Sequence, residues 1–406
     1  MHRKSKLKIV DNKSPRTRAE IRWWFLVIGG VCGFLIGLGL ILYSVLKPEE
    51  EVFDLNFPKI PSAAETGDTN SSLSPLTGAP LNEGETANAP TYCIQTPNGT
   101  DGARPQAGLN EAGVVFEAIA EAGITRFAAI YQNPKSAVIG PIRSLRIYYL
   151  EWDTPFDCTI VHAGGADDAL TALRAGGYRD LTENYAYMYR GTQGSRLWNN
   201  LFTTSADLNQ FAADNGYTSS SVKGFNRMTA NESRRNLVDG QVQEKLVITQ
   251  PTDANTSELT PRVVNASFVF GSTPAYNVSY AYDSSTNSYH RYYGNGLAHE
   301  IYTCPTEDLG ERNPEEVCTL TQMSPNVVIA MIVSEGKAAD NYHESISVIG
   351  SGTAYIFQNG LMVEGTWHKD SREEQIKFLN AAGEEIKLAP GQTFISAVPT
   401  YGGVEY

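Results

Sequence analysis

The sequence predicts a chain in two parts behind a membrane anchor: an α/β first domain and a mainly β second domain. Three patterns in the 406-residue chain support this organisation. An uncharged run lies near the start, strand-like runs then alternate with helical ones, and short alternating strands follow from about residue 260. Strands interleaved with amphipathic helices are typical of α/β layers, whereas closely spaced short strands are typical of β domains.

Changes in composition divide the chain into six segments, and its length allows two domains with cores of their own beyond the anchor. The segments are a cytoplasmic basic tail (1–22), a transmembrane helix (23–46), a flexible stalk (47–74), the first domain (75–240), a joint (241–260) and the second domain (261–406).

The anchor is predicted from the run at 23–46, which has no charged residue and is long enough to cross a bilayer as a helix. Eight Lys and Arg residues precede it against two acids, and Glu49, Glu50 and Glu51 follow it. By the positive-inside rule, the tail is cytoplasmic and the bulk of the chain is extracytoplasmic. A cleaved signal peptide is the alternative. The lack of a small-x-small site at the end of the run favours a retained single-pass helix in the cell membrane.

Four strands and two amphipathic helices are expected in the first domain. The strands are 113–119, 124–131, 136–139 and 159–161, and the helices are 167–175 and 205–215. One strand-like run, 245–249, interrupts the joint. The second domain is expected to contain a weak helix at 371–379 and strands at 266–270, 277–282, 289–293, 327–333, 353–358, 361–367 and 393–398.

The cysteines outside the predicted span are even in number, as disulfides in an oxidising compartment require. Cys304 and Cys318 are expected to form a local disulfide across a polar, Glu-rich loop, which leaves Cys93 to pair with Cys158. A zinc site is the alternative, but no CxxC pair or clustered His accompanies these cysteines. We therefore predict neither a metal nor a cofactor.

Arginines near predicted strand ends are the main candidates for chemistry. The candidates are Arg126, Arg143 and Arg146, together with Arg104. Guanidinium groups match the oxygens of phosphate and carboxylate and stay charged, so convergent arginines would make an anion site. Alternatively, each arginine pairs with a nearby acid and ties strands together, for example Glu111, Glu117 or Glu121. The sequence leaves both interpretations open.

Residues close to these arginines could complete a ligand site. Ser144 offers a hydroxyl, and Gly164 and Gly165 could present N–H groups at the start of a helix, where phosphate is favoured. His162 could act as a base or donor, although a lone His at a strand end is more often structural. Because the whole chain carries a net charge of −13, nucleic acid is not expected as a partner.

The same stretch resembles a known family. The segments ARPQAGLNEA (103–112), GITRF (123–127), IGPIRSLR (139–146) and HAGG (162–165) are similar to the N-terminal half of the YerB-like bacterial surface lipoproteins. Later segments, such as GSGTAYIFQNG (350–360) and PGQTFISAVP (390–399), are similar to the C-terminal half. The resemblance implies a two-part surface protein without an established activity. The usual lipobox is absent around Cys32, which again favours a retained helix.

These observations lead to one main hypothesis and two alternatives. The main hypothesis is an envelope protein that binds an anionic ligand, an envelope glycopolymer or its lipid-phosphate carrier, through the arginines. A weaker resemblance to the LytR-CpsA-Psr glycopolymer transferases implies phosphotransfer or hydrolysis, with a divalent cation held by Asp167 or Asp168. Those acids fit a helix start better, because negative charge is stabilised there. A scaffold that recruits other proteins is the third option.

Overall fold

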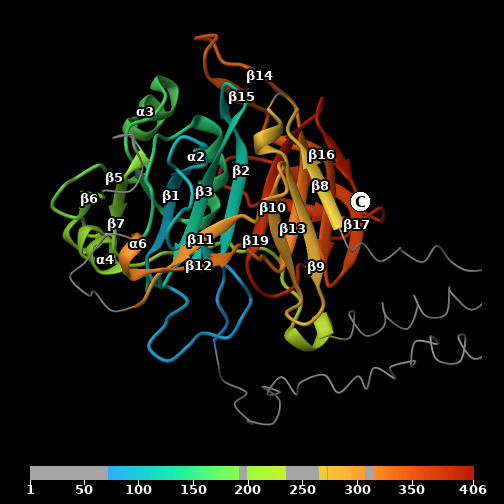
Figure 1. Ribbon diagram of the computed structural model, residues 1–406, viewed down its shortest axis with the longest axis horizontal. Helices are drawn as coiled ribbons and strands as arrows, with labels where there is room; N and C mark the ends of the chain where they lie inside the picture. Colours follow the sequence, from blue (N-terminus) through green and yellow to red (C-terminus); the bar gives the residue numbers. More distant parts are fainter. Residues whose placement is uncertain (1–71, 192–198, 235–264, 272, 307–313) are drawn as a thin grey trace, which may run out of the picture. The chain divides into compact units, whose positions relative to one another are not determined.

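The structure is a computed structural model, and it describes residues 72–191, 199–234, 265–271, 273–306 and 314–406 (Figure 1). The predicted tail, membrane span and joint, most of the stalk, and the strand expected at 245–249 lie outside these residues. In the part that is described, no helix combines the length and the apolar character that crossing a membrane requires.

One ten-stranded sheet runs through both halves of the chain, in the order β18-β17-β16-β13-β19-β2-β3-β1-β4-β5 (Figure 1). The first half supplies β1 (Thr91–Pro97), β2 (Val114–Glu121), β3 (Ile124–Gln132), β4 (Thr159–His162) and β5 (Arg179–Thr182). The second half supplies β13 (Val327–Val333), β16 (Gly350–Gln358), β17 (Leu361–Lys369), β18 (Lys377–Leu379) and β19 (Thr393–Pro399).

The two halves meet where β19 pairs with β2. These strands are parallel, with Phe394 opposite Val115 and Ser396 opposite Glu117. Parallel strands are usually covered on both faces and therefore consist of nearly continuous apolar runs. The sequence VVIAMIV of β13, the parallel neighbour of β19 on its other side, fits that rule. The chain is thus largely β, in two parts that share one sheet.

Smaller sheets and short helices surround the large sheet. The four-stranded sheet has the order β10-β9-β8-β20, from β8 (Asn265–Val269), β9 (Val278–Asp283), β10 (Ser288–Tyr293) and β20 (Gly403–Glu405). Two-stranded ribbons pair β6 (Met188–Arg190) with β7 (Leu201–Thr203), β11 (Glu300–Thr303) with β12 (Thr319–Gln322), and β14 (Glu335–Lys337) with β15 (Glu344–Ile346). The helices include α2 (Ile147–Asp153), α3 (Asp167–Arg174), α4 (Ser205–Asp214) and α6 (Pro314–Val317), residues 230–234 are also helical, and 3₁₀ turns occur at 109–111, 154–156 and 274–276.

Apolar side chains bury both faces of the large sheet, because successive residues of a strand point to opposite faces. Phe116 and Ile329 belong to the cluster that includes α2, where the Trp152 ring stacks on Phe116 with centroids 5.1 Å apart. Val328, the neighbour of Ile329, belongs instead to the cluster shared with the four-stranded sheet. The aromatic side chains of α2 therefore hold that helix against the sheet.

Most of the predicted elements are confirmed, including both amphipathic helices, which are α3 and α4. Two predictions are wrong. Residues 136–139 form no strand, and only Ile139 makes an isolated bridge, to Thr203. The helix expected at 371–379 is absent, because the end of this segment forms β18, where Phe378 is buried and paired with Trp367 of β17. The strand β1 and the helix α2 were not predicted.

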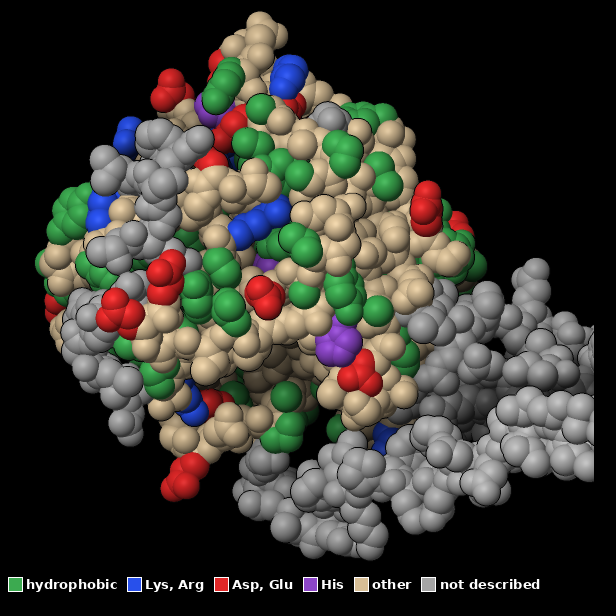
Figure 2. All heavy atoms as spheres, viewed as in Figure 1, with side chains coloured by type: hydrophobic (Ala, Val, Ile, Leu, Met, Phe, Trp, Pro, Cys, Tyr) green, Lys and Arg blue, Asp and Glu red, His purple; other side chains and the backbone are tan. Residues whose placement is uncertain are grey.

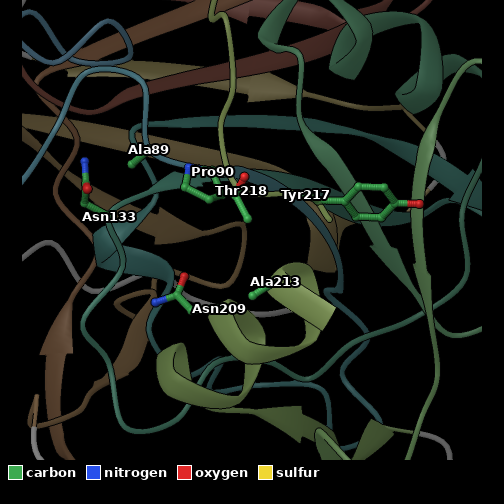
Figure 3. A pocket seen from close by; sticks show the side chains of 7 residues that line it. All are labelled: Ala89, Pro90, Asn133, Asn209, Ala213, Tyr217 and Thr218. Atoms are coloured by element: carbon green, nitrogen blue, oxygen red, sulfur yellow. The ribbon is translucent and has the colours of Figure 1, made fainter. Parts of the chain in front are cut away.

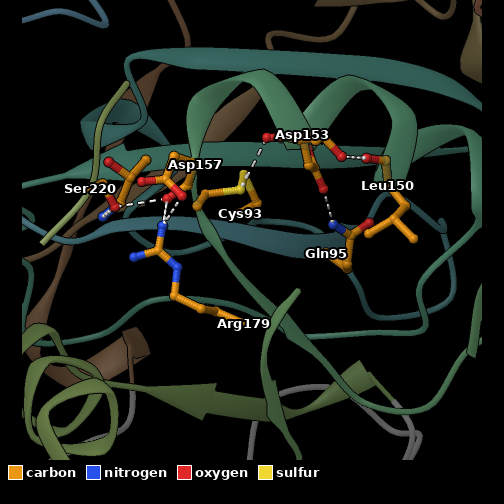
Figure 4. Close-up of a disulfide and its surroundings, with 10 residues drawn as sticks. Cys93, Gln95, Leu150, Asp153, Asp157, Arg179 and Ser220 are labelled. Carbon is orange, nitrogen blue, oxygen red and sulfur yellow. Dashed lines mark hydrogen bonds and ion pairs between the residues drawn. A yellow bond between two sulfur atoms is a disulfide. The ribbon is translucent and has the colours of Figure 1, made fainter. Parts of the chain in front are cut away.

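Both predicted disulfides are confirmed, Cys93 with Cys158 and Cys304 with Cys318. Cys93 lies on β1, and Cys158 immediately precedes β4, the parallel neighbour of β1 (Figure 4). The first disulfide therefore joins two strands that are already adjacent in the sheet.

A buried carboxyl group lies close to this disulfide (Figure 4). Asp153, at the end of α2, is 0 % exposed. Its Oδ2 accepts a hydrogen bond from Gln95 at 3.0 Å, and its Oδ1 is buried without a partner in the described chain. Burial raises the pKa of Asp153 well above its ordinary value, so the folded protein holds this group as the neutral acid at neutral pH.

We expect Asp153→Asn to increase the free energy of unfolding at pH 8 and to leave it nearly unchanged at pH 4. The unfolded chain ionises Asp153 above pH of about 4, whereas the folded chain does not, so stability decreases as pH rises toward the raised folded pKa. Asparagine removes that pH dependence. Urea unfolding at several pH values measures the effect, with the exposed Asp167→Asn as control. An equal difference between variant and parent at all pH values would show that Asp153 is ionised in the folded chain.

Candidate functional site

Two of the predicted arginines share one carboxylate, that of Glu121 at the end of β2. Arg126 on β3 donates from Nη2 to Oε1 of Glu121 at 3.0 Å. Arg146, just before α2, donates to Oε2 from Nη2 at 2.6 Å and from Nε at 3.1 Å. Both arginine side chains are 6 % exposed. We call these three residues the Glu121 cluster, and it has one positive charge in excess.

The Glu121 cluster is ionised at neutral pH. Burial alone would raise the pKa of Glu121, but the charges of Arg126 and Arg146 hold it below its ordinary value. Burial, together with the charge of Arg146, lowers the pKa of Arg126, although an arginine remains charged in the neutral range. Arg126 and Arg146 also donate to the carbonyls of Ser144 and Leu145, at 2.7 and 2.9 Å. These bonds fix the loop that precedes α2.

Arg143 is the third arginine of the predicted site. It is half-buried, and its side chain has neither an ion pair nor a hydrogen bond with the described residues. Burial lowers the pKa of Arg143, the nearby charge of Glu121 raises it, and that of Arg146 lowers it again. Arg143 is therefore within the electrostatic range of the Glu121 cluster. The charges of Asp101 and Arg190 also act on Arg143, the first raising and the second lowering its pKa.

The backbone of Arg143 is held between the ends of two strands. Its N–H donates to the carbonyl of Gln95 on β1 at 2.7 Å, and its carbonyl accepts from the N–H of Ala163, just after β4, at 3.0 Å. Since β1 and β4 are parallel, Arg143 lies at their carboxyl ends. In sheets with parallel strands, this is the edge outside which ligands commonly bind.

The other predicted ligand residues of this region are engaged in shaping the loop beside Arg143. His162 is 3 % exposed, and its Nδ1 and Nε2 bond to the carbonyl of Gly164 at 2.7 Å and to the carboxylate of Asp180 at 2.9 Å. Ser144 donates its hydroxyl to the carbonyl of Ala163 at 3.1 Å. Gly165 bridges to Leu145, which also donates its N–H to the Gly164 carbonyl. His162 therefore has no free ring nitrogen for a ligand.

The structure places Arg104 apart from the other three arginines. Its Nε donates to Oδ1 of Asn98 at 2.8 Å, and its guanidinium carbon lies 3.7 Å from the centroid of the Tyr293 ring. Its Nη2 is buried without a hydrogen-bond partner among the described residues. Burial lowers the pKa of Arg104, and the charge of Arg291 is one of the smaller influences on it. Arg104 therefore belongs to the interior between the two halves.

Sequence reasoning missed a fully buried ion pair that joins the halves of the chain. Nη2 of Arg291 on β10 lies 2.9 Å from both carboxylate oxygens of Glu117 on β2, and both side chains are 0 % exposed. The hydroxyls of Thr125 and Ser396 donate to the same carboxylate, at 2.9 and 3.2 Å. The signal in the sequence is a glutamate inside the apolar run VVFEAIA of β2.

Arg291 of this ion pair also contacts a neutral histidine, His299. Arg291 donates from Nη1 to Nδ1 of His299, so the ring proton of His299 is on Nε2, which donates to Oε1 of Gln106 at 3.0 Å. Burial, followed by the charge of Arg291, holds the pKa of His299 well below its ordinary value. This network is therefore satisfied internally, in contrast to Arg143.

The part of the chain described here shows no metal site beside the arginines. No group of three or more His, Cys, Asp or Glu side chains could hold a metal there, and Asp167 and Asp168 are exposed at the start of α3. One cavity, of about 290 Å³, contains no charged side chain (Figure 3). Its lining residues are Ala89, Pro90, Asn133, Asn209, Ala213, Tyr217 and Thr218.

Comparisons with known proteins give a consistent family. The model described as "Protein of unknown function (DUF3048) N-terminal domain" matches residues 76–218, and the corresponding C-terminal domain matches 267–395. "Putative lipoprotein YerB" of Bacillus subtilis (strain 168) is 27% identical over 329 residues, which cover 80% of this chain and 86% of the relative. The crystal structure of the YerB protein from Bacillus subtilis has a TM-score of 0.64 at 21% identity, and the match covers 82% of this chain and 100% of that one.

Proposed function

Since this chain belongs to the YerB-like family, whose two domains have no assigned function, we propose its function from the arginine site itself. It is an extracytoplasmic envelope protein that binds an anionic ligand at Arg143. The observation that carries this proposal is the half-buried guanidinium of Arg143, which makes no ion pair or hydrogen bond with the described residues, although the charges of Glu121 and Asp101 act on it. A partly desolvated cation without a partner gains most from a ligand that supplies the anion.

The neighbouring arginines make this position more favourable for an anion. Glu121 neutralises only one of the two guanidiniums that it contacts, so Arg143 and the Glu121 cluster together keep a positive charge even when the charge of Asp101, which acts on Arg143, is included. The whole chain carries −13, and basic side chains stand singly on the face in Figure 2. An anion is therefore expected at this local site rather than along a broad basic surface.

The proposed ligand is a phosphate-bearing envelope glycopolymer or its lipid-phosphate carrier. The two disulfides fit an oxidising compartment outside the cytoplasm. The predicted span at 23–46 would anchor the chain, and the relative named as a lipoprotein is consistent with a place at the membrane. Phosphate oxygens suit the fork geometry of a guanidinium.

We expect Arg143→Ala to weaken the binding of inorganic pyrophosphate to the full chain at least tenfold, because a charge-assisted contact is worth about 1.5–3 kcal/mol. Arg143→Lys should restore part of the affinity, since it keeps the charge but loses the fork. The matched control is Arg174→Ala, which removes an exposed arginine from α3 and should change the affinity less than twofold. Isothermal titration at low salt measures all four proteins.

The same titration separates the alternatives. Equal affinity of the parent chain and Arg143→Ala would contradict the proposal, and no binding by either protein would favour a scaffold. In a separate assay of phosphate release, release that depends on magnesium and on Arg143 would identify phosphotransfer or hydrolysis instead. That enzyme activity would also require acidic ligands for the cation, for which Asp167 and Asp168 are the candidates to replace.

A further inference from the structure

A second hollow, of about 410 Å³, lies where the turn between β2 and β3 meets the ribbon of β14 and β15. Its lining residues are Ile119, Ala122, Gly123, Glu335, Gly336, Lys337, Glu344 and Tyr401. We propose that this pocket binds the ammonium group of an organic amine, with Glu335 as the counter-ion. The proposal does not depend on the anion site at Arg143.

The acids and the base that line the pocket are unequal in number. Lys337 is paired with Glu344, whose side chain is 7 % exposed. Glu335 has no cation of its own. Its Oε1 accepts a hydrogen bond from the hydroxyl of Tyr401 at 2.9 Å, and its Oε2 is buried without a partner in the described residues. The pocket therefore contains one carboxyl group that lacks both a cation and a full set of donors.

The protonation of Glu335 fits this lack of a cation. Burial raises the pKa of Glu335 to about 7, and the negative charge of Glu344 raises it further. The hydrogen bond from Tyr401 and the positive charge of Lys337 lower the pKa in part. The charge of Glu335 is also one of the smaller influences that raise the pKa of Tyr148 on α2. Near neutral pH, the chain alone thus keeps Glu335 partly neutral, and a bound cation would favour its ionised form.

The shape and composition of the pocket favour an organic ammonium over a metal ion. A divalent metal needs several free oxygen ligands, whereas Glu344 is already paired with Lys337. Ile119 and Ala122 provide an apolar wall, and the ring of Tyr401 offers a face on which an ammonium group is attracted. A volume of about 410 Å³ suits a small organic group rather than a bare ion.

The pocket is next to the Glu121 cluster but chemically distinct from it. Ala122 directly follows Glu121 in the chain, whereas no arginine is among the residues that line the pocket. Binding at the two sites can therefore be removed separately.

The test titrates the full chain with Nα-acetyl-lysine amide and with its Nε-acetylated twin, which has the same shape but no charge. The amine should bind, and the acetylated twin should bind at least tenfold more weakly. Glu335→Gln should also weaken amine binding at least tenfold, whereas Glu364→Gln, at an exposed position on β17, should leave it within twofold. Tyr401→Ala, which removes the ring but not the carboxyl group, should weaken amine binding as well.

The dependence on pH provides an independent readout on the unmodified chain. Affinity for the amine should increase between pH 6 and 8 and then level off, because binding requires ionised Glu335. Equal binding of the two lysine derivatives, unchanged binding in Glu335→Gln, or a flat pH profile would each overturn the proposal. Arg143→Ala should leave amine binding unchanged, and Glu335→Gln should leave pyrophosphate binding unchanged, so failure at one site is distinguishable from failure at the other.

Discussion

Replacing Arg291 with methionine is expected to lower the free energy of unfolding by about 3–5 kcal/mol, because it leaves the carboxylate of Glu117 buried without its cation. Both side chains are 0 % exposed, so water cannot replace the lost partner. The hydroxyls of Thr125 and Ser396 would still donate to Glu117, but neither supplies a positive charge. Because Arg291 and Glu117 come from different halves of the chain, the substitution should weaken the contact between the two halves.

Urea unfolding of the Arg291→Met variant measures this effect, with Lys387→Met as the matched control. Lys387 pairs with Glu232 at the surface, where their side chains are 51 % and 34 % exposed, and a pair so exposed should contribute little to stability. The double variant Glu117→Gln/Arg291→Met should lose less than the two single variants combined, since it removes both charges. A loss for Arg291→Met no larger than that for Lys387→Met would contradict the assignment of a buried, dry ion pair.

Removing the Cys93–Cys158 disulfide is expected to cost about 4 kcal/mol, against about 3 kcal/mol for Cys304–Cys318. In the chain-entropy account, a disulfide restricts the unfolded chain more when it closes a longer loop. The sequence separations are 65 and 14 residues. Cys93 is also 0 % exposed and belongs to the core under α2, so its replacement should leave a small cavity in addition.

The two double variants, Cys93→Ala/Cys158→Ala and Cys304→Ala/Cys318→Ala, can be compared by denaturant unfolding under non-reducing conditions. The first should unfold at the lower denaturant concentration. Reduction of the parent chain should give at least the larger of the two losses. If the second variant were the less stable, loop length would not determine the contribution of these disulfides.

Strands were predicted where the local pattern alone determines them. The apolar run at 327–333 contains enough β-branched residues to indicate a buried strand, and it is β13. The helix expected at 371–379 failed because its apolar residues fit either structure, and pairing with β17 decided the outcome. The pairing of β19 with β2 was beyond prediction, since the partners are far apart in sequence and no local signal specifies which parallel strands meet.

The surroundings of the candidate arginines could be predicted only in part. Residue type and spacing indicated that Arg126, Arg143 and Arg146 could gather; Arg126 and Arg146 pair with Glu121, whose charge also acts on Arg143. Which of them would be neutralised depended on the end of β2, where Glu121 lies between Arg126 and Arg146. His162 was a candidate base or donor for a ligand, but the neighbouring strand β5 brings Asp180 to its Nε2, so the structural role that the sequence also allowed is the one observed. Such pairing between adjacent strands has no trace in local sequence.

The central claim is that Arg143 is a cation available to an anionic ligand, and NMR of arginine side chains tests it most directly. Pyrophosphate is titrated into the ¹⁵N-labelled full chain, with Arg143→Lys used to assign the signal. The account predicts that the Nε–H resonance of Arg143 shifts and saturates, while that of Arg174 stays in place. A resonance of Arg143 that does not move while pyrophosphate binds elsewhere on the chain would contradict it.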